Sequence, residues 1–404
     1  NVEVASIAYF DFDGMVDVRV ISNKERVNSA RVRPLSYKIT PDCVGDTVTF
    51  SLSRPRNLSV EVNGDIFHNL HLFANPIDKF RPSDKEIQRA LKKKKGSNLI
   101  YFGPGVHNLP NDTLFVPSGT TVYIDGGARV YGNIFTEGAH DVNIFGRGEV
   151  HPDGRGAGVW VRRSKNVRID GIVVSQLPIG QCDSVELTNV KSISYYGWGD
   201  GMDVFSSSNV ILDGVFCRNS DDCAAVYAST QGFKGGSNNV LVKNATLWAD
   251  VAHPINIGGH GDPNGMDTVQ NVTFRNIDIL DQAEKQVDYQ GCLAINPGDN
   301  TLVRNITFEN IRIEDFRNGQ LVNFRISFNP KYCVSTGRGI QNVLVKDVTY
   351  NGSGENLSII AGYDENHKIS GIRFVNLVVN GRKITDDMPG KPKWYKTGDM
   401  AGIF

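Results

Sequence analysis

Short alternations of apolar and polar residues dominate the first part of the chain. Clear examples cover residues 16–20, 47–52 and 58–62, and the last of these runs directly into Asn63-Gly64. An Asn-Gly pair after an alternating run is a strong signal of a β-hairpin. Because several such strands occur without a helical pattern, residues 1–75 are expected to form a small antiparallel β-sandwich.

Asn75-Pro76 and a polar stretch mark the end of this unit. Ser83 and Glu86 then have the spacing of a capping box, in which each side chain satisfies a free backbone amide at a helix start. Ile87, Ala90 and Leu91 follow as an apolar stripe. We therefore expect a short amphipathic helix near residues 83–95, which would cover the open end of the sheet that follows.

From about residue 97 the chain becomes repetitive. Asn-Val, an alternating run, Asp or Asn, and further apolar residues recur at 166–172, 209–215, 239–245, 271–277, 305–311, 342–348 and, in degenerate form, 371–377. Early copies (Asn166, Asn189, Asn209) are 20 to 23 residues apart, and later ones 30 or more, which indicates loops inserted on one side. Such a period with short strands predicts stacked coils about 4.8 Å apart. We expect residues 76–404 to form a right-handed parallel β-helix, which makes the whole chain all-β.

Composition and charge narrow the function classes. Apolar residues make up 40% and charged residues 22% of the 404 residues, as in soluble globular proteins, and the net charge of -1 argues against a nucleic-acid partner. The chain has no run of 18 apolar residues, so no membrane span is expected. It starts at Asn1 without a signal peptide, as a processed secreted or periplasmic protein would, although a trimmed chain would look the same.

Six cysteines are spread along the chain, namely Cys43, Cys182, Cys217, Cys223, Cys292 and Cys333. Their spacing matches no metal-binding pattern such as C-x-x-C. Free buried thiols are the favoured interpretation, and one or more disulfides remain the alternative. No metal or cofactor is expected, and the protein is expected to be a monomer.

Aspartates recur within the repeat at 198–203 and 219–226. Asp200 and Asp221 are 21 residues apart, one coil of the early period, so their carboxyls should lie close together. Crowding or burial raises at least one carboxyl pKa, which suits a general acid beside a base. Asp222 joins this candidate catalytic group, and Arg218 is the only basic residue near it in sequence. By contrast, Asp170, Asp203 and Asp213 are interpreted as turn residues.

These residues resemble the polygalacturonase clan, the glycoside hydrolases of families 28 and 49, over about residues 97–380. Residues 199–203 look like the Asn-Thr-Asp-Gly motif of family 28, and 221–226 match its Asp-Asp motif. Residues 253–258 have the register of the His-Gly segment, and 324–327 stand where Arg-Ile-Lys would be. The resemblance implies that Asp221 is the general acid, that Asp200 and Asp222 position and deprotonate water, that His253 holds or tunes the acid, and that Arg325 contacts sugar.

The histidine assignment has an alternative, because His260 in Gly-Gly-His-Gly also looks like a His-Gly motif. His253 is favoured because an Ile-x-Ile-Gly strand follows it directly. Several aromatic residues could stack on sugar rings or instead belong to the core. The residues expected to contact substrate are Trp198, Tyr227, Asn256, His260, Tyr289, Arg325, Lys331 and Tyr332.

Departures from the family pattern concern the substrate. Trp198 replaces the motif's Asn, and Ser327 replaces the Lys that would pair with a uronate carboxylate, although Lys331 or Arg338 could supply that cation. A leading β-sandwich is a feature of family 49, whose enzymes cut neutral α-glucans such as dextran or pullulan. A neutral α-glucan is therefore slightly favoured, and a pectin-directed, polygalacturonase-type hydrolase is the alternative.

The predicted function is an inverting glycoside hydrolase acting on an α-linked polysaccharide or oligosaccharide. Inversion requires carboxyls roughly 6.5–9.5 Å apart. A polysaccharide lyase is disfavoured because no cation-ligand motif appears, and a non-catalytic carbohydrate-binding solenoid is the alternative from another class. Insertions at 228–238 and 261–268 could close one end of the cleft, as exo action requires.

Overall fold

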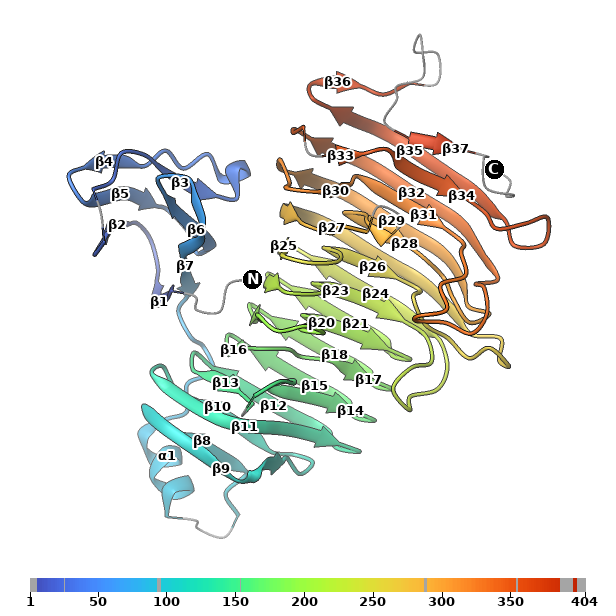
Figure 1. Cartoon of the computed structure of the whole chain (residues 1–404). Helices are drawn as coiled ribbons and strands as arrows, with labels where there is room; N and C mark the ends of the chain where they lie inside the picture. The colour runs from blue at the N-terminus through green and yellow to red at the C-terminus, as the bar shows by residue number, and fades with distance from the viewer. Residues whose placement is uncertain are drawn as a thin grey trace. The chain divides into compact units, whose positions relative to one another are not determined.

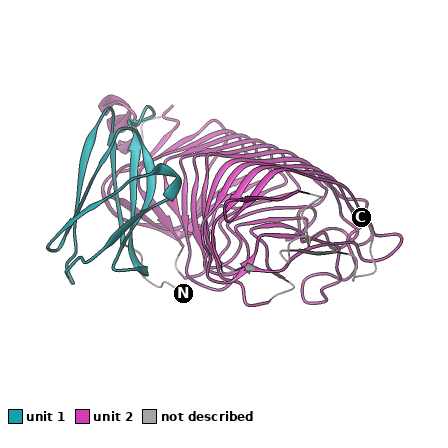
Figure 2. Ribbon diagram, turned by 90° about the horizontal axis from the view of Figure 1, so that it is seen from above, with its two compact units in different colours: residues 1–81 teal, residues 82–404 magenta. Residues whose placement is uncertain are grey.

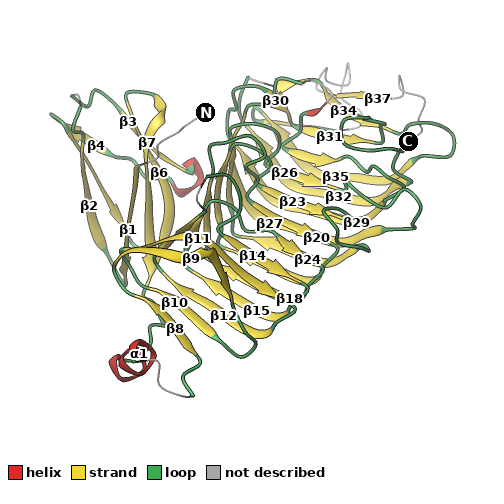
Figure 3. Cartoon of the chain, turned by 60° about the horizontal axis from the view of Figure 1, so that its bottom comes forward, coloured by secondary structure: helices red, strands yellow, loops and turns green. Residues whose placement is uncertain are grey.

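The computed structural model describes residues 6–385 and 395–397, except residues 25, 93–95, 153, 287–288 and 354. It contains two compact units, the first ending at Arg81 and the second beginning at Pro82 (Figure 2). Among the described residues, one α-helix and one short 3-10 helix, η1 (Leu35–Tyr37), interrupt a chain that otherwise forms strands (Figure 3). The predicted all-β class is confirmed.

The first unit contains two sheets that share one apolar core. One sheet has the order β1-β7-β6-β3 and the other β2-β5-β4. Their bounds are β1 (Ser6–Phe12), β2 (Val16–Ile21), β3 (Ala30–Arg33), β4 (Asp42–Val44), β5 (Thr47–Leu52), β6 (Arg56–Val62) and β7 (Asp65–Pro76). Val62 pairs with Asp65 across Asn63 and Gly64, which both have positive φ, as a two-residue hairpin turn requires. One pair departs from the antiparallel expectation, because β1 and β7 run parallel.

The second unit begins with α1 (Asp84–Leu91), which packs against β8 (Leu99–Phe102). Ser83 and Glu86 form both hydrogen bonds of the capping box. The apolar stripe is shorter than predicted, because Ile87 is buried while Leu91 is 57% exposed. The helix also ends before the predicted residue 95, and residues 93–95 lie outside the described part of the chain.

Strands of the second unit stack in three parallel rows, which form the faces of a right-handed β-helix (Figure 1). The first row contains β8, β10 (Thr121–Ile124), β12 (His140–Gly146), β15 (Lys165–Asp170), β18 (Asp183–Thr188), β21 (Ser208–Asp213), β24 (Ser237–Lys243) and the first parts of β27 (Thr268–Gln282), β29 (Leu302–Ile313), β32 (Gly339–Tyr350) and β35 (Ile369–Val379). The second contains the first parts of β9 (Gly105–Phe115) and β11 (Ala128–Glu137), then β13 (Glu149–His151), β16 (Val173–Val174), β19 (Lys191–Ile193), β22 (Phe216–Asn219), β25 (Thr246–Ala249) and the later parts of β27, β29, β32 and β35.

The third row carries the candidate site. It contains the ends of β9 and β11, then β14 (Val159–Arg162), β17 (Ile179–Gly180), β20 (Met202–Phe205), β23 (Ala224–Tyr227), β26 (Ile255–Ile257), β28 (Leu293–Ile295), β31 (Val322–Arg325), β34 (Ser358–Ala361) and β37 (Tyr395–Thr397). Shorter pieces are β30 (Gly319–Gln320), β33 (Glu355–Asn356) and β36 (Arg382–Lys383). In every row, alternate side chains point inward and form one continuous apolar core.

Stacked asparagines explain the recurring sequence phrase. Asn209, Asn239 and Asn276 adopt left-handed backbone conformations at the turns, which asparagine tolerates better than most residues. Their amides also bond from coil to coil; Asn239 Nδ2, for example, donates to Asn209 Oδ1 at 2.7 Å. The predicted early period needs correction, because Val167 pairs with Val185, so Asn189 belongs to a second turn rather than to the Asn166 position.

Candidate active site

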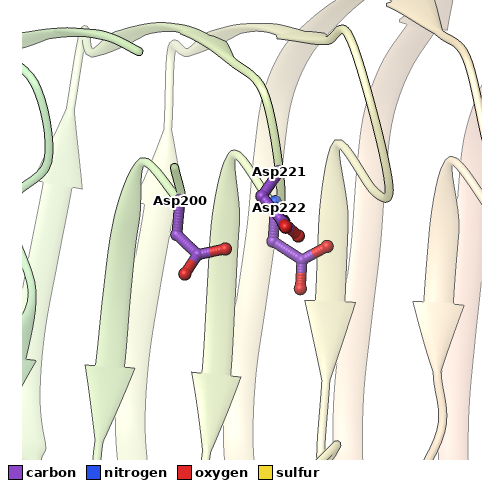
Figure 4. Close-up of side chains that lie close together, drawn as sticks. All are labelled: Asp200, Asp221 and Asp222. Carbon is purple, nitrogen blue, oxygen red and sulfur yellow. Dashed lines mark hydrogen bonds between the residues drawn. The ribbon is translucent and has the colours of Figure 1, made fainter. Parts of the chain in front are cut away.

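Asp200, Asp222 and His253 occupy the same position on three successive coils, just before strands β20, β23 and β26. Met202 pairs with Ala224, so the same offset places Asp200 opposite Asp222. Ala224 pairs in turn with Ile255, which places Asp222 opposite His253. Figure 4 shows Asp200 at the start of one strand and Asp221 with Asp222 at the start of the next.

Gly201 is needed where Asp200 meets the next coil. A Cβ atom on Gly201 would lie 2.2 Å from the carbonyl oxygen of Cys223, which is too close for any side chain at this position. The Gly201 amide donates to the Asp222 carbonyl at 2.7 Å. The Asp-Gly sequence therefore brings the two coils together at the point where the carboxyls are placed.

Asp222 is buried and is held by four hydrogen bonds. Its Oδ1 accepts bonds from the backbone amide of His253 at 3.0 Å and lies 2.7 Å from His253 Nδ1. Its Oδ2 accepts from the Tyr227 hydroxyl at 2.5 Å and from Asn256 Nδ2 at 2.8 Å. Burial alone would raise the pKa of Asp222, but the charge of His253 and these donors lower it below the usual range. Asp222 therefore remains a carboxylate.

Asp200 and Asp221 bring their carboxyls close together, and we call these two residues the dyad. Burial, followed by the charges of Asp221 and Asp222 and a hydrogen bond with the Asp221 side chain, raises the pKa of Asp200 well above its usual range. Burial and the charge of Asp222 raise the pKa of Asp221 to about 7. Two crowded carboxyls of this kind lose their protons in separate steps, so the dyad retains one proton over a wide pH range.

Asp203 is a further member of the acidic cluster that sequence reasoning assigned to a turn. It instead lies within strand β20, is 4% exposed, and points to the outer face of the β-helix. Burial and the charges of Asp200, Asp222 and Asp221 raise its pKa well above the usual range. The period-2 spacing of Met202 and Val204, both in the core, is the sequence signal that could have placed Asp203 outward.

His253 is fixed from three sides. Its ring meets the Tyr289 ring edge-on, with centroids 4.5 Å apart. The preceding Ala252 adopts a left-handed conformation with φ of 62°, which is rare for alanine. Glu284 Oε2 accepts the Ala252 amide at 3.2 Å, and Gln282 Nε2 donates to the Ala252 carbonyl at 3.0 Å. Glu284 is thus a buried positioning residue that the sequence alone did not indicate.

An aromatic wall stands beside the dyad. Tyr289 stacks on Tyr332 with centroids 5.3 Å apart, and Tyr332 meets Trp198 edge-on at 6.2 Å. Trp198 is 63% exposed and has φ of 62°, an unusual conformation for a bulky residue that favours a functional role. Lys331 Nζ lies 4.7 Å from the Tyr332 ring and 5.6 Å from the Trp198 ring. A cation therefore lies on the aromatic wall.

Other predicted residues lie further from the acidic cluster. His260 meets the Tyr227 ring edge-on at 5.0 Å and does not contact Asp222, which favours His253 as the site histidine. Arg325 is the last residue of β31, which lies two coils beyond β26. The strand between them is β28, which consists of Leu293, Ala294 and Ile295.

The neighbouring arginines are engaged elsewhere. Arg338 donates to the Asp267 carbonyl at 2.9 Å, whereas Lys331 lies on the aromatic wall. Arg218 forms an ion pair with Asp250 at 3.0 Å and lies over the Trp248 ring. Its ion-pair partner is therefore not one of the three candidate catalytic aspartates.

Several buried polar atoms at the site have no hydrogen-bond partner within the described part of the chain. They are His253 Nε2, Asp203 Oδ1 and Asn256 Oδ1. Such unpaired atoms are unusual, because most buried polar atoms in proteins are hydrogen-bonded. One oxygen from each of Asp200, Asp221 and Asp222 lies within 4.8 Å of the others, a spacing that could also hold a cation.

All six cysteines are free thiols, and all except Cys43 are buried. The favoured interpretation of the cysteine pattern is therefore confirmed. None of the helices in the described residues is long and apolar enough to cross a membrane.

Comparison with known proteins agrees with this geometry. A polygalacturonase of Juniperus ashei is 26% identical over 295 residues, covering 65% of this chain and 54% of the relative. A probable endopolygalacturonase D of Neosartorya fischeri is 24% identical over 285 residues, covering 61% and 55%. The chain thus spans about half the length of the curated relatives it matches.

Solved structures share the fold. Dex49A from Penicillium minioluteum matches with a TM-score of 0.60 and 15% identity, over 97% of this chain and 83% of that one. A family 28 exopolygalacturonase from Yersinia enterocolitica matches with a TM-score of 0.53 and 13% identity, over 82% and 84%. The family pattern for glycosyl hydrolases family 28 matches residues 158–388, which include every candidate catalytic residue. The chain belongs to glycosyl hydrolases family 28.

Proposed function

We propose that the protein hydrolyses glycosidic bonds of a polysaccharide by aspartate acid–base catalysis. The observation that carries this proposal is the position of the dyad beside Asp222, with one oxygen from each of the three aspartates within 4.8 Å of the others. Burial and crowding raise the pKa of both dyad carboxyls, whereas the hydrogen bonds of Asp222 keep that carboxyl ionised. Glycoside hydrolysis needs one carboxylic acid to protonate the leaving oxygen and one carboxylate to activate water. An acidic cluster used only to bind sugar would gain nothing from keeping a buried proton.

In this scheme, Asp221 protonates the glycosidic oxygen. Asp200 accepts the proton of the attacking water, because in the reactive form the single proton of the dyad lies on Asp221 and Asp200 is ionised. Asp222 already accepts four hydrogen bonds, so we assign it the role of a fixed negative charge that orients the water and stabilises positive charge on the sugar. His253 holds Asp222 through its Nδ1 contact.

We further propose that hydrolysis inverts the anomeric centre. A retaining reaction requires a carboxylate oxygen that attacks the sugar, and the lone pairs of Asp222 are occupied by protein donors. The closest oxygens of the three aspartates lie within 4.8 Å, which is shorter than the roughly 6.5–9.5 Å of typical inverting pairs. The hydrogen bonds of Asp222 favour inversion, whereas the spacing does not. The anomeric form of the first product, observed by proton NMR, distinguishes inversion from retention directly.

For the substrate we propose a galacturonan of the pectic class. The slight preference for a neutral α-glucan rests on the leading β-sandwich, a feature of family 49, and on Ser327, which stands where a lysine would bind uronate. Lys331 can supply that cation, because its ammonium lies on the aromatic wall within electrostatic reach of Asp221. The two curated relatives described above are named as a polygalacturonase and a probable endopolygalacturonase, which favours the same substrate.

The test is incubation with a panel of pectic and neutral α-glycans, followed by measurement of product size and anomeric form. Release of reducing ends from polygalacturonate, with neutral glucans left intact, is the expected result. An unsaturated product that absorbs ultraviolet light would identify a lyase instead. Binding without any product would reduce the protein to a carbohydrate-binding solenoid.

A further inference from the structure

Three aromatic side chains form a row on the outer face of the third strand row, at the N-terminal end of the β-helix. This aromatic strip consists of Phe115 on β9, Phe135 on β11 and Trp160 on β14. The rings of Phe115 and Phe135 stack with centroids 5.5 Å apart, and those of Phe135 and Trp160 with centroids 6.5 Å apart and an 8° interplanar angle. The neighbours Ile134, Val159 and Val161 point into the core, so the strip faces outward.

Exposure distinguishes this strip from the aromatic stacks that stabilise the coils. Phe115 is 65% exposed, and Phe135 and Trp160 are each partly exposed. By contrast, Phe274 and Phe308 stack in the same way within the core and are fully buried. A row of rings kept in contact with solvent contributes less to folding than a buried one, and it leaves flat apolar faces available to a ligand.

The strip is continuous with the candidate active site. Val161 pairs with Ile179, and Ile179 pairs with Val204, so Trp160 lies two coils from Asp203 on the same face. At about 4.8 Å per coil, Trp160 is about 10 Å from the Asp203 position and Phe115 about 19 Å. Trp160 also packs against a small outer cluster that contains Phe205, Phe233 and Tyr227. Tyr227 is the residue that donates its hydroxyl to Asp222.

Positive charge borders the strip. The Arg162 guanidinium carbon is 5.8 Å from the ring centroids of both Phe135 and Trp160. Arg163 lies beside it, 5.0 Å over the Phe233 ring. Both arginines share Glu137, at 3.0 and 3.1 Å, so the group carries a net positive charge. Stacking rings with a cation at their edge suit a chain of sugar rings that bear carboxylates.

We propose that the aromatic strip is a second binding surface, which holds the distal part of an acidic polysaccharide chain while another part of it occupies the dyad. This inference rests on the proposed function for its choice of ligand. The strip lengthens the bound segment of a long chain and makes no contact with a short one. Binding should therefore strengthen with chain length, and the strip should account for the gain.

The test uses calorimetric titration of the full-length Asp221→Asn protein with galacturonate oligomers, from the trimer to chains of about ten residues. In this background, long oligomers are expected to bind more tightly than the trimer. Replacing both Phe135 and Trp160 by alanine is expected to weaken binding of long oligomers about tenfold and leave the trimer unchanged. Phe67→Ala, which removes an exposed ring from the first unit, serves as the control and should change neither affinity.

Two results would overturn the proposal that the strip binds substrate. One is a gain in affinity with chain length that is unchanged in the double variant. The other is an equal loss of affinity for the trimer, with a matching drop in thermal stability. Phe115→Ala keeps the proposal testable if the double variant folds poorly, because this ring is the most exposed of the three. If neutral α-glucan oligomers show the gain that depends on the strip, the strip is supported and the galacturonan assignment fails. If long galacturonates bind through the strip but wild-type protein never cleaves them, only the hydrolase proposal fails.

Discussion

Asp221→Asn tests the catalytic scheme most directly. The substitution preserves the size of the side chain, and an amide oxygen can still accept the Asp222 amide that Asp221 Oδ1 accepts at 3.1 Å. It removes both the transferable proton and one of the like charges that crowd Asp200 and Asp203. We therefore expect the variant to fold and to be at least as stable as the parent protein. The variant lacks the general acid.

The expected loss follows from the role of that proton. General acid catalysis contributes about 10²- to 10⁴-fold, which corresponds to about 3–5 kcal/mol of transition-state stabilisation. Because the variant retains the aromatic wall and Lys331, binding of a substrate oligomer should remain largely intact. The loss should therefore appear in kcat rather than in the dissociation constant.

The pH profile supplies a second readout of the same change. Asp221 must be protonated to act, so the rate of the wild-type protein should fall as pH rises through about 7, the pKa of this group. Any residual activity of Asp221→Asn should lack that alkaline limb. The measurement is kcat and kcat/KM for reducing-end release from pH 4 to 9, with oligomer binding measured in parallel.

A matched control uses the same substitution at another strand end. Asp213→Asn changes an aspartate that pairs with Lys243 and accepts a bond from Asn244, at the end of β21 in the first strand row. Its activity and pH profile should match those of the parent. Near-wild-type turnover in Asp221→Asn, or an alkaline limb that persists in it, would refute the role assigned to Asp221.

Three further substitutions test the surroundings of the dyad and of the coils. Tyr227→Phe removes a donor to Asp222 Oδ2 and should therefore raise the pKa of that carboxyl. The acid limb of the kcat/KM profile should then move to higher pH. An unmoved limb would show that Asp222 need not be ionised. Lys331→Met should raise KM for polygalacturonate about fivefold while Lys331→Arg restores it, and an equal effect on neutral oligosaccharides would contradict uronate binding. Asn276→Ala should lower the free energy of unfolding in urea by about 1 kcal/mol, because Asn276 has φ of 57°, whereas Asn276→Gly should cost less; equal losses would point to the side-chain ladder instead.

Local sequence patterns predicted the architecture because they act within a few residues. Asn63-Gly64 determines a hairpin through the backbone conformation that both residues tolerate, and Ser83 with Glu86 caps a helix through bonds three residues apart. Apolar alternation that recurs in every coil specifies which side chains enter the core. The β-helix, the sandwich and the approach of Asp200 to the Asp221–Asp222 pair were predictable on these grounds.

Tertiary structure decided the features that depend on coil register and on loops. Coils differ in length, so only strand pairing shows that Asn189 belongs to a second turn and that Asp203 lies beside Asp200. Glu284 acts through the backbone of Ala252 on the preceding coil, and Lys331 reaches the site from a distant turn. The sequence by itself determined that aspartates stack on a β-helix, because the repeat is local. Which of them keep protons, and which cation faces the substrate, depend on burial and on contacts between segments far apart in the chain.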